Sequence, residues 1–321
     1  MTSHIPFDSA APPLGFGAAQ LGNLYRPTDD ETSRRAVDTA WELGVRYFDT
    51  APHYGLGLSE RRLGAALAGR PRDQYTISTK VGRLLVPTPE HADRLDEEGF
   101  AVPAAFRRAW DFSRDGILRS LDASLERLGL DRIDIVYLHD PDDHWTAAST
   151  TGVGALIELR DQGVIGAIGV GMNQSAMLAE FVRRCDIDLV MLAGRYTLLD
   201  QSAADDLLPA AAERGVGVVA AGAYNSGLLS SDRIPDDAKY DYADAPAEVL
   251  ARARRIAEIC AQHGVTVPAA AVQFPLRRPE VVSVVLGTRT AEQIVQGAER
   301  MATAVPDALW SDLAAQGLVR P

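Results

Sequence analysis

The sequence predicts a single-domain α/β protein, a (β/α)8 TIM barrel that spans residues 1–321. Strand-like runs and amphipathic helical stretches alternate along the whole chain, which indicates a parallel sheet covered by helices. Eight such runs occur, and the length of 321 residues suits one barrel with insertions. No Pro/Ser/Gly-rich linker and no shift in composition marks a domain boundary. A doubly wound open sheet also accommodates eight units and is the alternative.

The expected strands are short runs of β-branched or apolar residues. They span residues 14–18, 45–48, 75–79, 133–138, 165–170, 189–192, 216–220 and 281–286. Helical stretches lie between them, and a stripe that must face the core runs through residues 115–128. This stripe contains Ile117, Leu121, Leu125 and Leu128. Glycine tolerates the left-handed conformation that ends many helices. It stands at four expected helix ends, at Gly44, Gly129, Gly163 and Gly215.

Two segments interrupt the alternation. Residues 82–112 follow the third strand and are too long for an ordinary strand–helix loop. Barrels place substrate contacts in the loops at the C-terminal ends of their strands, so we expect such contacts in this segment. Residues 230–246 follow the seventh strand and are expected to be a lid or a disordered insertion.

Composition and charge exclude several classes of protein. The net charge is −12 and the pI is about 5.0. An acidic surface repels phosphate backbones and anionic lipids, so nucleic acids and membranes are not expected partners. The two cysteines, Cys185 and Cys260, have no metal-ligand spacing and are expected to be buried thiols in a reducing compartment. Without a recognisable signal peptide or a bilayer-length apolar run, the protein is expected to be cytoplasmic.

Four polar residues are expected at the C-terminal ends of consecutive strands or beside them. Asp49 follows the second strand, Lys80 the third and His139 the fourth. Tyr54 lies in the loop five residues after Asp49. Each residue alone is more often a cap, a rim residue or a solvated strand end. Because parallel strands end at one face of a barrel, we expect the four together to surround one point.

Such a group of residues can transfer a proton to or from a carbonyl or hydroxyl oxygen. The Lys80 ammonium is expected to lower the pKa of Tyr54, with Asp49 orienting Lys80. Tyr54 then acts as an acid in reduction and as a base in oxidation. His139 is expected to hydrogen-bond the substrate oxygen. None of these residues is a hydride source, so a cofactor has to supply or accept the hydride. No metal-binding cluster, P-loop or nucleophile elbow is visible, and no metal is expected.

Two strand–helix junctions are candidates for cofactor binding. Residues 287–293 follow the last strand, and backbone N–H groups there, with Arg289, can hold a phosphate. A plain turn and helix cap is the alternative for this segment. Residues 169–174 nearly match a dinucleotide fingerprint, and Asn173 and Gln174 are available to a nicotinamide amide. The pairs Arg107-Arg108 and Arg277-Arg278 are expected to be solvated surface residues.

Several motifs resemble the aldo-keto reductase family. They are FDTAPHYG at residues 48–55, SERRLG at 59–64, STK ending at Lys80 and DIVYLH ending at His139. The resemblance runs from about residue 14 to about residue 297. It implies a barrel that binds an extended NAD or NADP without a Rossmann domain, and a site of Asp49, Tyr54, Lys80 and His139. It also implies cofactor contacts at one loop and at the last junction, at Gly171, Met172, Asn173, Gln174, Gly287, Thr288, Arg289 and Gln293.

Four further motifs resemble one branch of the family. They lie at residues 111–117, 169–174, 195–201 and 224–229. The branch includes L-fucose or D-threo-aldose 1-dehydrogenases, L-galactose dehydrogenases and pyridoxal 4-dehydrogenases. It implies a small-molecule hemiacetal or carbonyl substrate, with oxidation of an aldose at C1 to a lactone. The alternatives are a pyridoxal 4-dehydrogenase, a general NADPH aldehyde or ketone reductase, and a non-enzymatic cofactor-binding regulatory subunit.

The sequence also departs from the family pattern. Ala221 stands where many members stack a Tyr on the nicotinamide, and Ala193 replaces a common Gln. Gln293 and Gly297 replace the Arg and Asn that often bind the 2′-phosphate of NADP. These replacements favour NAD, although Arg289 can partly substitute for the missing Arg. The sequence does not indicate an oligomeric state.

Overall fold

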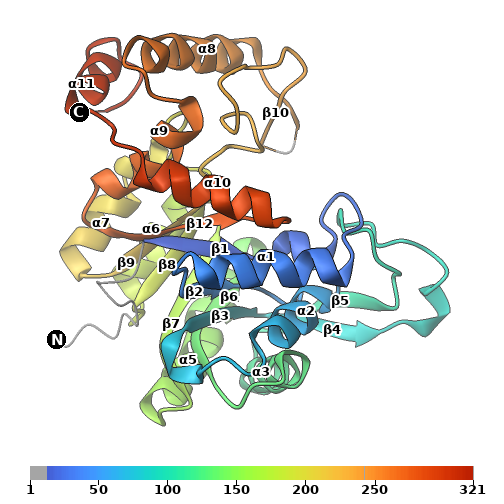
Figure 1. Cartoon of the computed structure of the whole chain (residues 1–321). Coiled ribbons are helices and arrows are strands. Elements are labelled where there is room, and N and C mark those ends of the chain that lie inside the picture. Colours follow the sequence, from blue (N-terminus) through green and yellow to red (C-terminus); the bar gives the residue numbers. More distant parts are fainter. Residues whose placement is uncertain (1–12, 242, 321) are drawn as a thin grey trace.

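A computed structural model of the chain describes residues 13–241 and 243–320. Eight parallel strands close into a barrel in the order β1-β12-β9-β8-β7-β6-β3-β2 (Figure 1). The barrel strands are β1 (Leu14–Gly17), β2 (Tyr47–Asp49), β3 (Thr76–Val81), β6 (Ile133–His139), β7 (Ile165–Met172), β8 (Leu189–Ala193), β9 (Gly217–Ala221) and β12 (Val281–Gly287). Because β1 pairs with both β2 and β12, the sheet has no open edge. The predicted barrel is therefore confirmed, and the doubly wound alternative is wrong.

Helices surround the barrel, and their apolar faces join one core with its outer surface (Figure 1). They are α1 (Asp30–Glu42), α2 (Leu58–Leu67), α3 (Arg114–Leu128), α4 (Trp145–Ala147), α5 (Val153–Asp161), α6 (Ser175–Arg184), α7 (Leu207–Arg214), α8 (Ala247–Gln262), α9 (Val267–Gln273), α10 (Ala291–Ala302) and α11 (Asp307–Ala315). Of these, α8 packs on α9 and α11, further from the strands. In α3 the Ser113 hydroxyl accepts a bond from the Gly116 N–H, and Gly129 ends the helix at a φ of 65°. These caps satisfy backbone groups that a helix leaves unpaired at its ends.

A second, smaller core fills the barrel interior. It contains Tyr47, Ile135, Tyr137, Ala167, Leu189, Met191, Val219 and Val285. Large side chains fit there because the neighbouring strands carry glycine beside them. A Cβ atom on Gly15 would lie 2.8 Å from Tyr47 Cδ1, and one on Gly169 would lie 3.0 Å from Tyr137 Cδ1. The interior is thus packed, and the chemistry must take place at one end of it.

The segment of residues 82–112 contains an antiparallel hairpin, formed by β4 (Arg83–Pro87) and β5 (Phe106–Trp110). Between these strands, Phe100 and Val102 pack with Leu56 in a separate apolar cluster that Tyr54 also contacts. The long segment after β3 therefore folds back beside the loop that carries Tyr54. Residues 230–246 also contain a short hairpin, of β10 (Lys239–Tyr240) and β11 (Ala243–Asp244).

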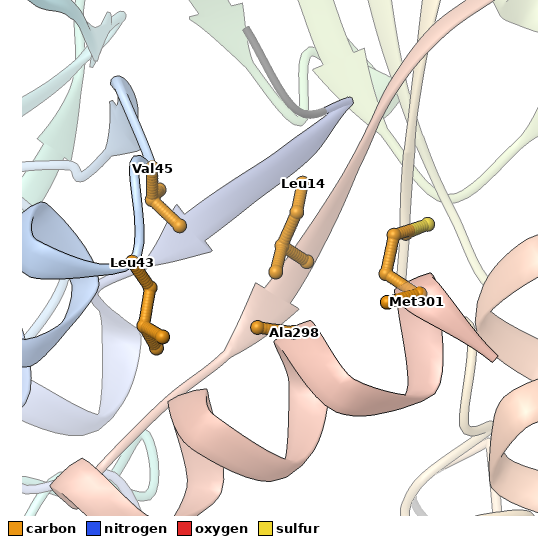
Figure 2. Close-up of a pocket in the computed structure, with 6 residues that line it drawn as sticks. Leu14, Leu43, Val45, Ala298 and Met301 are labelled. Carbon is orange, nitrogen blue, oxygen red and sulfur yellow. The ribbon is translucent and has the colours of Figure 1, made fainter.

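An apolar pocket of about 390 Å³ lies between α10 and the start of β1 (Figure 2). It is lined by Leu14, Leu43, Val45, Ala298, Met301 and Ala302. Leu14 begins β1, so the pocket lies at the N-terminal ends of the strands. Its lining carries no polar side chain that can take part in proton transfer. The predicted site residues lie instead at the C-terminal ends of the strands.

Both cysteines are buried and unbridged, as the sequence predicts. Burial raises the pKa of the Cys260 thiol to about 11, so this group is protonated at neutral pH. Burial also raises the pKa of Cys185. None of the helices in the described part of the chain has the length and apolarity needed to cross a bilayer.

A buried carboxylate joins α2 to α3. The Glu60 side chain is fully buried, and its oxygens accept bonds from Arg127 Nε at 2.6 Å and Thr79 Oγ1 at 2.8 Å. Replacing Arg127 by Met leaves this carboxylate without a cation, so we expect the free energy of unfolding to fall by about 3 kcal/mol. Urea denaturation at neutral pH measures the change. The control is Arg114→Met, which breaks an exposed pair with Glu158 and should cost less than about 1 kcal/mol. Equal losses in both variants would contradict a special role for the buried pair.

Candidate active site

A buried ion pair lies at the C-terminal ends of β2 and β3. Lys80 Nζ lies 2.6 Å from Asp49 Oδ2, and both side chains are less than 5% exposed. The parallel register aligns Asp49 with Ser78, so Lys80 lies one pleat further along the neighbouring strand. Both side chains therefore enter the mouth of the barrel from adjacent strands. A second hydrogen bond fixes the position of the ammonium, because Nζ also donates to the Thr50 carbonyl at 3.0 Å.

Tyr54 completes a short chain of contacts. Lys80 Nζ donates to the Tyr54 hydroxyl at 3.1 Å. The loop that carries Tyr54 lies directly against the loop after β1, where a Cβ atom on Gly55 would lie 2.2 Å from the Gly22 carbonyl oxygen. Gly55 also has a φ of 63°, which side chains rarely adopt. The glycine that follows Tyr54 in the sequence motif thus allows the close approach that fixes the tyrosine.

The protonation of Tyr54 differs from the expectation. Burial raises the pKa of Tyr54 above its usual 10.0, and the nearby Lys80 only partly opposes this effect. Lys80 therefore lowers the pKa of Tyr54 as predicted, but burial outweighs this effect, so the net shift is upward. Burial also opposes the charge of Lys80, but Asp49 and Tyr54 together raise the pKa of Lys80. At neutral pH the site holds a protonated tyrosine beside an ammonium.

His139 ends β6 on the other side of Tyr54. The two rings are perpendicular, with centroids 5.9 Å apart. Burial, followed by the charges of Arg83 and Lys80, holds the pKa of His139 well below its usual range. The imidazole is therefore neutral and has one N–H to donate. Its Nδ1 atom is buried without a hydrogen-bond partner. The structure thus brings all four predicted residues, Asp49, Tyr54, Lys80 and His139, to one mouth of the barrel.

A hydrogen-bond chain continues beneath Asp49 into the barrel interior. The Ser78 hydroxyl donates to Asp49 Oδ1 at 2.7 Å and contacts the Tyr47 hydroxyl at 3.0 Å. The Tyr47 and Tyr137 hydroxyls lie 3.3 Å apart. Because Ser78 occupies one carboxylate oxygen, Asp49 turns the other toward Lys80. No role was predicted for these three residues, since they occur within strand runs. Only the alternation of side chains along a strand could have indicated them.

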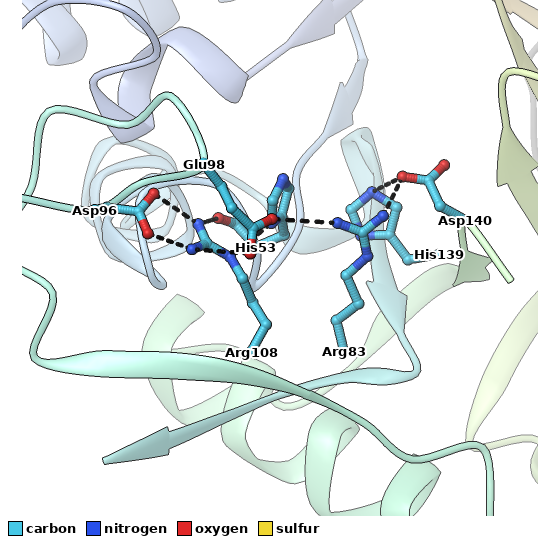
Figure 3. Close-up of polar contacts among 7 residues, drawn as sticks. All are labelled: His53, Arg83, Asp96, Glu98, Arg108, His139 and Asp140. Atoms are coloured by element: carbon cyan, nitrogen blue, oxygen red, sulfur yellow. Dashed lines mark hydrogen bonds and ion pairs between the residues drawn. The ribbon is translucent and has the colours of Figure 1, made fainter. Parts of the chain in front are cut away.

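His53, next to Tyr54, is held by a residue of the hairpin (Figure 3). Arg108 Nε donates to His53 Nδ1 at 2.8 Å, which leaves the ring proton on Nε2. Burial and the neighbouring arginines lower the pKa of His53 to about 2, so it forms no ion pair with Glu98. Arg108 is only 8% exposed and is paired with Asp96. The prediction that Arg108 is a solvated surface residue is wrong, because the hairpin folds it inward; Arg107 beside it is exposed.

A second arginine of the hairpin reaches the residue after His139 (Figure 3). Arg83 Nη2 lies 2.5 Å from Asp140 Oδ2, and Arg83 Nη1 lies 3.9 Å from Glu98. Asp140 Oδ2 in turn lies 3.6 Å from His139 Nε2. Charged groups from the insertion therefore line the space in front of the catalytic candidates. Their roles could not be read from the sequence, because the insertion has no helical or strand periodicity that orients its side chains.

The candidate nicotinamide contacts lie at the end of β7. Gly171 pairs with His139 in the sheet, and Met172 is buried beside it. Asn173 is half-buried and Gln174 is exposed, where it precedes α6 without capping it. Two amide side chains are thus presented next to the His139 strand. Ala193 and Ala221, which stand at the ends of β8 and β9, pair with each other in register and leave small side chains on that part of the rim.

The last strand–helix junction differs from the expectation. Gly287 ends β12, and Thr288 is buried with its hydroxyl donating to the Leu286 carbonyl. The Arg289 guanidinium donates to the carbonyls of Leu24 at 2.5 Å and Arg26 at 2.9 Å, and also contacts Thr28. Arg289 therefore ties this junction to the loop after β1. Its expected role as a free phosphate-binding cation is not supported, because the side chain is buried and both Nη atoms donate to the loop after β1.

Gln293 takes up a backbone N–H group that was expected to bind phosphate. Its Oε1 accepts the Arg289 backbone N–H at 2.8 Å. Nearby, Gln20 Oε1 is buried without a hydrogen-bond partner, and a Cβ atom on Gly287 would lie 2.5 Å from Gln20 Nε2. This buried acceptor is open to a donor from water or from a bound molecule. The residues at the ends of β1, β7 and β12 therefore fit a polar cofactor with amide groups. Among the residues that the structure describes, no three His, Cys, Asp or Glu side chains are grouped to hold a metal ion.

The chain is similar to known proteins over nearly its whole length. The model of the Aldo/keto reductase family matches residues 13–315. D-threo-aldose 1-dehydrogenase from a Pseudomonas species is 50% identical over 313 residues, which are 97% of this chain and 95% of that protein. Pyridoxal 4-dehydrogenase from Microbacterium luteolum is 41% identical, over 95% of this chain and 94% of its own. The structure of an aldo-keto reductase from Bacillus halodurans in its holo form has a TM-score of 0.75 at 28% identity, and covers 96% of this chain and 92% of that one.

Proposed function

The chain belongs to the aldo/keto reductase family, and from this premise we propose that it oxidises the cyclic hemiacetal of an aldose at C1 to a lactone. The family uses NAD(P)H, and the chain is an NAD(P)-dependent oxidoreductase. The observation that carries the proposal is the contact of Tyr54 with the buried Lys80–Asp49 pair. The substrate class is supported by the 50% identity to a D-threo-aldose 1-dehydrogenase.

In this proposal Tyr54 exchanges a proton with the oxygen on C1. During oxidation the Tyr54 phenolate takes the hydroxyl proton while a C1–O double bond forms. Bound NAD(P)⁺ supplies the acceptor for the hydride that leaves C1. Lys80 donates a hydrogen bond to the Tyr54 oxygen and stabilises its anionic form. Asp49 holds the ammonium in place, and neutral His139 donates a hydrogen bond to the substrate oxygen.

We further propose that the enzyme prefers NAD to NADP. Gln293 is uncharged and bonded to the Arg289 backbone, and the Arg289 side chain is engaged by the loop after β1. The additional phosphate of NADP would need a cation at this junction. Asn173 and Gln174 are the proposed partners of the nicotinamide amide.

A pyridoxal 4-dehydrogenase activity is the second candidate. It is supported by the 41% identity to such an enzyme over 95% of this chain. Pyridoxal also forms a cyclic hemiacetal, and the same proton transfer at Tyr54 would convert it to a lactone. The two candidates therefore share their chemistry and differ in the group that the hairpin has to recognise.

An absorbance assay of nicotinamide reduction tests the proposed substrate and cofactor. The compounds are L-fucose, D-arabinose, L-galactose, L-xylose and pyridoxal. Each compound is tested with NAD⁺ and with NADP⁺. We expect the highest kcat/KM with one of the sugars and NAD⁺. Oxidation of pyridoxal alone would favour the second candidate, and higher efficiency with NADP⁺ would contradict the argument from Gln293. If the enzyme reduces simple aldehydes with NADPH and oxidises none of these compounds, both proposed substrates are wrong and only the family assignment stands.

A further inference from the structure

Asp140 has an unusual backbone beside the proposed catalytic residues. It directly follows His139 and adopts a φ of 40°, a left-handed conformation that costs free energy outside glycine. Its backbone N–H is bonded to the Gly171 carbonyl at 2.9 Å, so the turn is well anchored. The side chain is 33% exposed, although Oδ2 lies only 3.6 Å from His139 Nε2. The strained turn therefore places a carboxylate at the edge of the reaction space, still open to a ligand.

Arg83 holds this carboxylate from the opposite side (Figure 3). Its Nη2 lies 2.5 Å from Asp140 Oδ2, and its side chain is 14% exposed. The guanidinium also lies over the Trp110 ring, 4.4 Å from the centroid, so the paired strand of the hairpin supports it. Its Nε atom is buried without a hydrogen-bond partner. Arg83 is thus rigidly placed, yet part of its donor capacity is unused.

We propose that Asp140 and Arg83 form a subsite that recognises the hydroxyl group on the carbon next to the oxidised one. This inference rests on the proposed function. A substrate oxygen bonded to His139 Nε2 lies about 3 Å from it, and neighbouring hydroxyl oxygens of a sugar lie close enough for the second to reach Asp140 Oδ2. That hydroxyl donates to the Asp140 carboxylate and accepts from the Arg83 guanidinium, which are strong charge-assisted bonds.

The subsite explains what the hairpin contributes to specificity. A simple aldehyde adds nothing to the ion pair that Arg83 and Asp140 form with each other, whereas a polyhydroxylated substrate adds a hydrogen bond to each group. A site built to hydrogen-bond a substrate hydroxyl discriminates against analogues that lack it. Arg83 and Asp140 are therefore specificity-determining residues, and neither takes part in the proton transfer.

The test compares two pairs of sugars that differ only in this hydroxyl. D-arabinose is compared with 2-deoxy-D-ribose, which lacks the C2 hydroxyl, and L-fucose is compared with 2-deoxy-L-fucose. We expect wild-type kcat/KM to favour the hydroxylated member by about 10- to 100-fold. In Asp140→Asn, a substitution that tolerates the left-handed backbone, this preference should fall at least about tenfold. The loss should come mainly from a higher KM for the hydroxylated sugar, with the deoxy sugar almost unaffected.

Two further variants complete the test. Arg83→Gln should reduce the same preference, and it changes a residue outside the strained turn, so it remains informative if Asp140→Asn folds poorly. The control Asp161→Asn removes the same charge from a side chain that is 70% exposed on α5, and should leave the preference unchanged. Equal losses on hydroxylated and deoxy sugars in both subsite variants would overturn the inference. If the wild type oxidises no sugar of either pair, the proposed function fails, and the inference falls with it.

Discussion

Replacing Tyr54 by Phe is expected to lower kcat for lactone formation by about 10²- to 10⁴-fold, the usual contribution of a positioned acid or base. The substitution removes only the hydroxyl that Lys80 contacts at 3.1 Å and leaves the ring in its apolar cluster. We therefore expect NADH affinity to change by less than about twofold, because the barrel and its rim are unaltered. Steady-state absorbance assays measure the rate, and fluorescence titration measures NADH binding.

The control for this experiment is Tyr75→Phe. Tyr75 is also buried and packs its ring against Trp41 and Phe48, but it directly precedes the N-terminal residue of β3, at the opposite end of the barrel from the proposed site. Its variant should retain the wild-type rate. A Tyr54→Phe enzyme that turns over at an undiminished rate would sink the proposed mechanism, whatever the substrate.

Replacing Lys80 by Met is expected to reduce oxidation strongly and to change its pH dependence. Oxidation needs ionised Tyr54, and burial raises the pKa of Tyr54 above 10.0 while Lys80 opposes the rise. In the wild type, kcat/KM for oxidation should therefore increase with pH up to about pH 10 or beyond. Without Lys80 the pKa of Tyr54 rises further, so the increasing limb moves to higher pH and the rate at neutral pH falls. Initial rates between about pH 6 and pH 11 measure the shift.

The matched control is Lys239→Met, which removes an exposed ammonium that pairs with Asp244 in the distant β10–β11 hairpin. Its pH profile should match the wild type. Reduction provides a second readout, because it needs protonated Tyr54, which predominates at neutral pH in both enzymes. A Lys80→Met profile with an unshifted oxidation limb would mean that Lys80 does not act on Tyr54.

The barrel itself could be predicted from the sequence because its signals are local. Each run of apolar residues had to be covered on both faces, and each amphipathic stretch had to place one face on a core. All eight expected strands are present, with ends shifted by at most a few residues. The four proposed catalytic residues were predictable for the same reason. Side chains that follow parallel strands meet at one end of a barrel, whatever the rest of the chain does.

The surroundings of these residues were not predictable. Arg108 and Arg83 lie on a hairpin whose two strands begin 23 residues apart, so their inward direction depends on how that insertion folds over the loop of His53. Arg289 was expected to bind phosphate, but both of its Nη atoms donate to carbonyls more than 260 positions away in the sequence. No local pattern encodes a contact over such a separation.

The sequence by itself determined the order of the elements, the parallel architecture and the set of residues at the C-terminal ends of the strands, since periodicity and strand ends are properties of neighbouring residues. The closure of the sheet was decided by the pairing of β1 with β12, which are far apart in the chain. Only the tertiary structure decided which charged groups face the mouth of the barrel, which of them are already engaged, and whether Tyr54 or its phenolate predominates. The reason is that burial and electrostatic interactions depend on distances between residues remote in the chain. The ammonium of Lys80 favours the phenolate, but the desolvation of Tyr54 outweighs it, and that balance exists only in the folded protein.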